Sequence, residues 1–125
     1  MTSFQNDNGT ASFMSGLTAT TILAVGDDSG ASLCFYLIVQ ADGRWFRIMV
    51  DEGVLVVEPT HPPNVEDHHD DESDILYVVT KEPHAILDLS IHLGQMRLRL
   101  SGGGVLEACE DPDTSMMRVL CVGLS

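Results

Sequence analysis

Short apolar runs separated by turn residues dominate the middle of the chain. Apolar and β-branched residues fill three runs, at positions 33–39, 45–50 and 54–57. Asp42-Gly43 separates the first two runs, and Asp51-Glu52-Gly53 separates the last two. Glycine adopts the positive φ that tight hairpin turns require. The pattern therefore predicts a three-stranded antiparallel meander.

The second run of this meander predicts which side chains form the core. Successive side chains of a strand point to opposite faces of the sheet, so the run divides into two sets. The set on the expected core face is Phe46, Ile48 and Val50. The set on the other face, which either covers another part of the molecule or is covered by it, is Trp45, Arg47 and Met49.

Residues 84–104 alternate in the same way and predict a second hairpin that turns near Gly94. The apolar set is Ile86 or Leu87, Leu89, Ile91, Leu93, Met96, Leu98 and Leu100. His92, Arg97 and Arg99 fall on the opposite faces. The two hairpin regions together give about five strands.

Two segments have helix-like spacing. In residues 10–25 the positions at near-helical intervals are Phe13, Leu17, Thr20 or Thr21, and Leu23 to Val25, although Gly16 and four threonines oppose a helix. Residues 111–125 begin with Pro112 and three capping candidates, and then place an apolar stripe at helical spacing. The capping candidates are Asp113, Thr114 and Ser115, and the stripe is Met116, Val119, Leu120 and Gly123 or Leu124.

Residues 74–80 fit either kind of element. Their β-branched content favours a strand, whereas Asp71 or Ser73 could cap a helix that stops before Pro83. With a helix here, the chain is predicted to be α+β, with an antiparallel sheet of about five strands, helices on one face and the order α-β-β-β-α-β-β-α. We expect one domain over residues 1–125, with a disordered tail at 1–9 and an acidic, histidine-rich loop at 59–73.

The charge balance restricts the classes of partner. Nineteen acidic and six basic residues give a net charge of −13, which repels phosphate backbones and anionic lipid surfaces. Neither nucleic acid nor a membrane is expected as a partner. A basic polypeptide suits this surface better, although an acidic balance also serves solubility alone.

The cysteines and the N-terminus favour a cytoplasmic protein. Cys34, Cys109 and Cys121 are odd in number and form no C-x-x-C pair, so neither a disulfide framework nor a zinc knuckle is indicated. The N-terminal residues lack the basic start and apolar run of a secretory signal. No apolar run approaches the roughly 18 residues of a membrane span.

The segment THPPNVEDHHDDESD at residues 60–74 contains the strongest metal-ligating composition. His61, His68 and His69 stand among six carboxylates, and imidazole with carboxylate binds zinc, nickel or copper. Adjacent histidines on a flexible loop do not easily converge on one ion. A solvated connection is therefore the favoured interpretation, with no metal or other cofactor.

Catalytic motifs do not stand out. The run SGGG at 101–104 lacks the Lys-Ser or Lys-Thr of a phosphate loop and predicts a flexible turn. Serine, cysteine and histidine occur, but not in a nucleophile elbow or a protease signature. The expected activity is binding without catalysis.

The candidate binding residues come from methionine, tryptophan and leucine. Methionine adapts its shape and is over-used on surfaces that accept varied apolar partners, although core filling is its ordinary role. Alternation and helical spacing give as exposed candidates Trp45, Met49, Met96 and Met117, with Leu120 and Leu124 at a dimer seam.

The predicted element order resembles that of the small acidic chaperones of type III secretion and of YbjN-like proteins. The segments that carry the likeness are YLIVQADGRWFRIMVDEGVLVVEP, PHAILDLSIHLGQMRLRLSGG and DTSMMRVLCVGL. The resemblance implies a helix at DESDILYVVTKEP, although this segment is rich in valine where that family has leucine and asparagine. It also implies a homodimer that holds an extended partner polypeptide on apolar patches beside a sheet.

A sterol-carrier domain is the alternative. The run FYLIVQADGRWFRIMVDEGVLVV followed by GQMRLRLSGG is similar to that of such lipid-binding domains, in which a sheet and helices enclose an apolar tunnel. Only residues 81–93 separate a strand at 74–80 from Gly94, which is too few for the helices that close such a tunnel.

Overall fold

The computed structural model describes residues 3–30, 32–63 and 74–124. These residues form eleven strands and two short 3₁₀ turns, η1 (Ser12–Met14) and η3 (Ser101–Gly103). The strands are β1 (Phe4–Asn6), β2 (Gly9–Thr10), β3 (Thr18–Gly26), β4 (Leu33–Ala41), β5 (Arg44–Asp51), β6 (Val54–Pro59), β7 (Ile75–Thr80), β8 (His84–His92), β9 (Gln95–Leu100), β10 (Val105–Glu110) and β11 (Met117–Val122). About 63% of the chain is strand and 5% is helical, so the prediction of an α+β fold with helices on one face is wrong.

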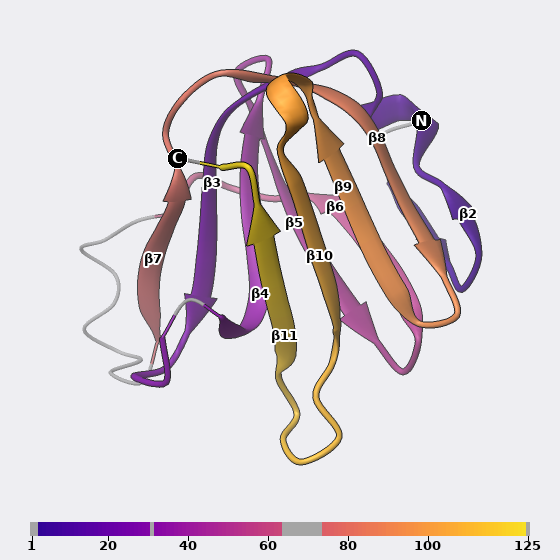
Figure 1. The fold of residues 1–125 in the computed structure, drawn as a ribbon, viewed down its shortest axis with the longest axis vertical. Helices are drawn as coiled ribbons and strands as arrows, with labels where there is room; N and C mark the ends of the chain where they lie inside the picture. The colour runs from indigo at the N-terminus through magenta and orange to yellow at the C-terminus, as the bar shows by residue number, and fades with distance from the viewer. Residues whose placement is uncertain (1–2, 31, 64–73, 125) are drawn as a thin grey trace.

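Six antiparallel strands close into a barrel. Following the hydrogen-bonded neighbours from β3 gives β4, β11, β10, β9, β8 and then β3 again. The sheet extends beyond β4 through β5, β6 and β1, and β7 adds to β3 (Figure 1). Closure removes most of the unpaired strand edges that a flat sheet would expose.

β3 and β4 each carry two neighbours on one edge, and this allows the barrel to close. β8 pairs with the start of β3 at Thr18 and Ala19, and β7 pairs with the rest of that edge. Likewise β11 pairs with the start of β4, whereas β5 pairs with its second half. At β3 and at β4 the sheet therefore divides into two layers, one leading to β8 and β11 and the other to β7 and β5. The core lies between these layers.

The core contains the side chains that the alternation predicted. Phe46, Ile48 and Val50 are buried, which confirms the expected core face of β5. The second hairpin also buries its apolar set, namely Ile86, Leu89, Ile91, Met96, Leu98 and Leu100. Leu93 is the exception, because it lies in the β8–β9 turn and is 89% exposed.

The predicted hairpin turns are confirmed. Asp42-Gly43, Glu52-Gly53 and Leu93-Gly94 each have two consecutive residues with positive φ. This is the geometry of a type I′ turn, whose twist matches that of the strands it joins. The meander at β4–β5–β6 and the hairpin at β8–β9 both follow from these turns.

The three predicted helices are absent from the described residues. Within 10–25 only Ser12–Met14 forms a helical turn, and Thr18–Gly26 is strand β3 because its threonine, isoleucine and valine residues favour extended backbone. Residues 75–80 form β7, which agrees with their β propensity and contradicts the helix implied by the chaperone resemblance. The predicted C-terminal helix is β11.

The N-terminal residues are also more ordered than expected. Phe4–Asn6 pairs with β6, and Gly9–Thr10 pairs with β8, instead of fraying as a tail. Most of the predicted acidic loop, residues 64–73, lies outside the described residues. Within the described part of the chain, no helix has the length and apolarity needed to cross a bilayer.

Candidate binding surface at the β7 edge

β7 is one end of the strand order of the described residues. Its hydrogen-bonded partner among the described residues is β3, along Ile22–Gly26, and it stands at the left side of the ribbon in Figure 1. An end strand leaves the N–H and C=O groups of its outer edge available to another strand. Ile75 and Val78 are 37% and 55% exposed on this strand.

A second apolar cluster lies beside this edge. It consists of buried residues packed against partly buried ones, on the face of the β7–β3–β4–β5 layer that points away from the barrel core. We call it the outer cluster, and its members are Leu23, Val25, Ile38, Tyr36, Trp45 and Leu76. Leu76 pairs with Val25 and Val78 pairs with Leu23, so Val78 continues the outer cluster to the sheet edge.

Amphipathic side chains border the outer cluster. The guanidinium of Arg47 lies 5.5 Å from the ring centre of Tyr36, within the range of a cation–π contact. Arg47 also forms an ion pair with Glu58 on the neighbouring strand, and both side chains remain partly exposed. The carboxylate of Glu58 therefore balances the charge of Arg47 beside the cluster.

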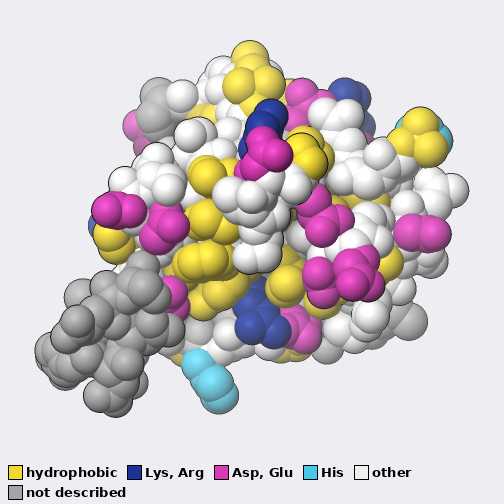
Figure 2. Space-filling view, turned by 90° about the horizontal axis from the view of Figure 1, so that it is seen from below, with side chains coloured by type: hydrophobic (Ala, Val, Ile, Leu, Met, Phe, Trp, Pro, Cys, Tyr) yellow, Lys and Arg dark blue, Asp and Glu magenta, His cyan; other side chains and the backbone are white. Residues whose placement is uncertain are grey.

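Acidic side chains surround both ends of β7. Gly26 pairs with Ile75, which brings Asp27 and Asp28 to the strand's start, beside Asp74. The Tyr77 hydroxyl donates a 2.5 Å hydrogen bond to the Asp27 carbonyl and fixes this approach. Viewed from below, hydrophobic side chains lie between acidic ones on this end of the molecule (Figure 2).

The carboxylate of Asp27 stays ionised at neutral pH. The side chain and the backbone N–H of Ser29 hydrogen-bond to it and lower its pKa from the ordinary value. Lys81 and Glu82 follow the other end of β7. The edge therefore combines an apolar centre with negatively charged ends.

The six predicted binding residues divide into three groups. Trp45 and Met49 are partly exposed on the outer face, as the alternation indicated. Met96 and Met117 are fully buried in the barrel core, so their prediction as exposed binding residues is wrong. Leu120 is 60% exposed on β11, and Leu124 is partly buried against the core.

The alternation of β11 explains the error at Met117. Met117 and Val119 are buried, whereas Arg118 and Leu120 are exposed, so the segment follows a two-residue period. Reading it as a helix placed Met117 on the outside. The β7 edge is not among the predicted binding residues. The sequence shows that residues 75–80 favour a strand, but it does not show which strand they pair with, and therefore not that they lie at a sheet edge.

A depression of about 500 Å³ is lined by residues of β10 and β11 together with Ser32, Leu33 and Gln95. Arg118 lines this depression, and its Nε donates a 2.7 Å hydrogen bond to the buried carboxylate of Asp111. Asp111 also accepts a 2.9 Å hydrogen bond from the Thr114 hydroxyl. These contacts hold the β10–β11 turn and leave the depression without an unpaired charge among the described residues.

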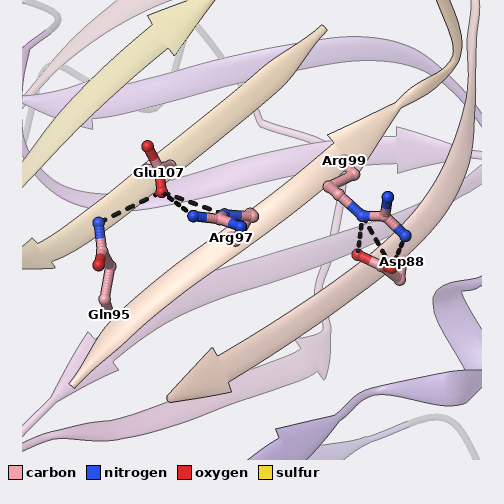
Figure 3. Close-up of polar contacts among 5 residues, drawn as sticks. All are labelled: Asp88, Gln95, Arg97, Arg99 and Glu107. Carbon is pink, nitrogen blue, oxygen red and sulfur yellow. Dashed lines mark hydrogen bonds and ion pairs between the residues drawn. The ribbon is translucent and has the colours of Figure 1, made fainter. Parts of the chain in front are cut away.

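Other polar pairs in the barrel wall join neighbouring strands. Figure 3 shows Arg99 against Asp88, and Arg97 with Gln95 against Glu107. Each pair is exposed and links two adjacent strands, which is a structural role. Among the described residues no three histidine, cysteine or carboxylate side chains form a metal-binding group. His68 and His69, the core of the predicted metal alternative, lie outside the described residues.

Comparison with protein-family models, with curated proteins and with solved structures found no match to this chain. The element order that carried the resemblance to secretion chaperones is replaced by a strand order in the structure.

Proposed function

We propose that this protein is a non-enzymatic binding module that takes up an extended, basic segment of a partner polypeptide by strand addition to β7. The observation that supports it is the position of β7, an end strand with exposed apolar side chains that adjoins a sheet face already apolar. In strand addition, main-chain hydrogen bonds supply affinity and alternate side-chain sites supply specificity.

The outer cluster explains why alternate partner side chains would be apolar. A strand added to β7 continues the same layer, so every second side chain lies on the outer face beside Leu76 and Val78. Burying one such valine or leucine contributes about 1.5–3 kcal/mol relative to leaving it exposed. The intervening side chains lie on the other face of the layer.

The charges around the edge explain why the partner would be basic. Asp27, Asp28, Asp74 and Glu82 lie at the two ends of β7, with Lys81 as the opposing charge. Lysine or arginine residues of an incoming segment would be attracted to these ends, and the net charge of −13 would steer the encounter. The same charge opposes binding of acidic segments.

A cytoplasmic location fits this proposal. Cys34, Cys109 and Cys121 are all free thiols. Unpaired cysteines are typical of proteins in a reducing compartment.

The lipid-carrier alternative has less support from the geometry. The barrel interior is filled by side chains, among them Phe46, Met14, Ile22, Leu37 and Leu55, all essentially inaccessible to solvent. An apolar tunnel would need this space. The hydrophobic surface that remains available lies outside the barrel.

The test uses a fluorescently labelled peptide in which valine and lysine alternate. Fluorescence anisotropy should show saturable binding, and the emission of Trp45, the chain's one tryptophan, should change because it belongs to the outer cluster. A peptide alternating valine and glutamate should not bind. Methylating alternate amide nitrogens of the basic peptide should abolish binding, since it removes the donors but keeps the charge.

Two matched variants locate the site. Val78→Asn should weaken binding of the basic peptide about tenfold, because it removes an apolar contact at the edge. Leu87→Asn, at a residue of β8 that is 50% exposed, should leave binding unchanged. Equal binding of the methylated peptide, equal effects of the two variants, or no binding of the basic peptide would each reject strand addition at β7.

A further inference from the structure

The two halves of β11 have different neighbours. Met117 and Arg118 pair with β4, but from Val119 to Val122 the described pairing of β11 is with β10 alone. In Figure 1, β11 stands in front of β4. The second half of β11 therefore has an open edge, separate from that of β7.

One hydrogen bond defines which backbone groups point to this edge. The Val119 N–H donates to the Ser32 carbonyl on the β4 side at 2.8 Å. In an antiparallel strand, the backbone groups of alternate residues point to the same edge. The N–H and C=O of Cys121 therefore point to the open edge, while those of Leu120 point to β10.

The side chains on this half-strand are apolar and accessible. Leu120 and Val122 lie on the outer face and are 60% and 56% exposed. Residues 119–124 read VLCVGL and contain no charge. Strand edges are commonly protected from pairing by charged residues or proline, and this one has neither.

The distribution of charge distinguishes the β11 edge from the β7 edge. Residues 1–83 contain fourteen acidic and three basic residues, whereas residues 84–125 contain five acidic and three basic residues. In the second part the arginines are paired, Arg99 with Asp88 and Arg97 with Glu107 (Figure 3). Arg118 pairs with Asp111. Self-association is opposed least at this nearly neutral surface.

We propose that two copies of this chain form a homodimer by antiparallel pairing of their β11 edges about a two-fold axis at Cys121. With this register, Cys121 exchanges both backbone hydrogen bonds with the same residue of the second copy. Leu120 then lies opposite Val122 of the partner subunit, so the interface is apolar and self-complementary. The acidic β7 edges stay away from the axis, which leaves them available to other partners.

The edge is short, so the dimer is a reversible one. A stable dimer interface buries on the order of 1,200–2,000 Å² in total, more than a four-residue strand edge supplies. Association should therefore depend on protein concentration. Sedimentation equilibrium over a wide concentration range should show a monomer–dimer equilibrium with no larger species, because the two-fold pairing closes on itself.

Three variants test the position of the interface. Leu120→Glu should raise the dissociation constant about tenfold or more, since it places two carboxylates near the axis. Leu87→Glu, a matched exposed leucine on β8, and Val78→Asn at the β7 edge should both leave the dimer unchanged. In a Cys109→Ser background, a short bis-maleimide should cross-link the dimer through Cys121, because Cys34 is buried.

A monomer at every concentration would overturn the proposal. So would a dimer that Leu120→Glu leaves intact, or one that Val78→Asn disrupts, since the latter would place the seam at β7. Because Leu120 and Leu87 are both exposed, neither substitution removes core packing, and circular dichroism of the variants should match that of the unchanged protein.

Discussion

Gly123 lies so close to the carbonyl oxygen of Gly103 that a Cβ added at position 123 would stand 2.6 Å from that oxygen. The contact joins the end of β11 to the β9–β10 connection at one end of the barrel. A Cβ at Gly104 would similarly lie 2.6 Å from Leu124 Cδ2. The glycines of SGGG therefore permit close packing of two chain segments, in addition to forming a turn.

Replacing Gly123 should destabilise the fold through both backbone conformation and packing. Its φ is +72, so Gly123→Ala adds about 1–2 kcal/mol of left-handed strain and about 1–3 kcal/mol of overpacking. Gly102→Ala is the matched control, because Gly102 has φ +80 but no heavy atom within 4 Å of the added Cβ. Urea unfolding should show the larger loss for Gly123→Ala. Equal losses would mean that the contact with Gly103 contributes nothing.

The β8–β9 turn should gain stability from a change at Leu93. Leu93 has φ 51 and is 89% exposed, so it has unfavourable backbone geometry without compensating burial. Asparagine tolerates this conformation and is favoured with a following glycine in type I′ turns. We expect Leu93→Asn to raise the free energy of unfolding by about 0.5–1 kcal/mol. Leu87→Asn, within a strand, should give no such gain, and a loss at position 93 would show that its side chain makes a stabilising contact.

The sequence predicted strands and turns where local patterns were sufficient. Asp42-Gly43, Gly53 and Gly94 identified the hairpin turns, and alternation identified Phe46, Ile48 and Val50 as core residues. These features depend on contacts between neighbouring segments. The exposure of the candidate binding residues was predicted only in part, since Trp45 and Leu120 lie at the surface and Met96 and Met117 lie in the core.

The missing features depend on contacts between distant segments. Barrel closure requires β11 to pair with β4 and β8 to pair with β3, and no local signal encodes either pairing. β3 is buried on both faces from Leu23 to Gly26, which hides the alternation that identifies a strand. Pro112 and the polar residues after it resemble a helix start but form the β10–β11 turn, where Asp111 accepts the hydrogen bonds.

The ion pair between Asp88 and Arg99 should make stability depend on pH in the acidic range. Arg99 Nε donates to both Asp88 oxygens, at 3.0 and 2.9 Å, and these hydrogen bonds lower the pKa of Asp88. A lowered folded-state pKa means that the contribution is present above the unfolded-state value of about 3.9 and is lost as the pH falls through the folded-state value. The Asp88 carboxyl should accordingly titrate below its ordinary range by NMR.

Arg99→Leu provides the comparison for this pair. Without the guanidinium, the pKa of Asp88 should return toward the ordinary range, and the acid-dependent stability difference between the variant and the parent should vanish at low pH. Added salt should weaken the pair because it is exposed. An unchanged Asp88 titration in Arg99→Leu would show that the pair does not persist in solution.

Cys34 should be the least reactive of the three thiols. It is fully buried at the β4–β11 junction, and burial, with a smaller contribution from Cys121, raises its pKa to about 12. The thiolate is the reactive form, so at pH 8 Cys34 should resist maleimide labelling in the folded protein and react only after unfolding. Peptide mass spectrometry after pulsed labelling would identify the modified positions.

Because the unfolded Cys34 thiol ionises near pH 8.5 whereas the folded one does not, the free energy of unfolding should also fall as the pH rises through that value. Cys34→Ala should reduce this alkaline dependence and leave the part due to Cys121, whose pKa is also raised by burial. Labelling of Cys34 as fast as Cys121 in the native protein would contradict the closed junction between β4 and β11.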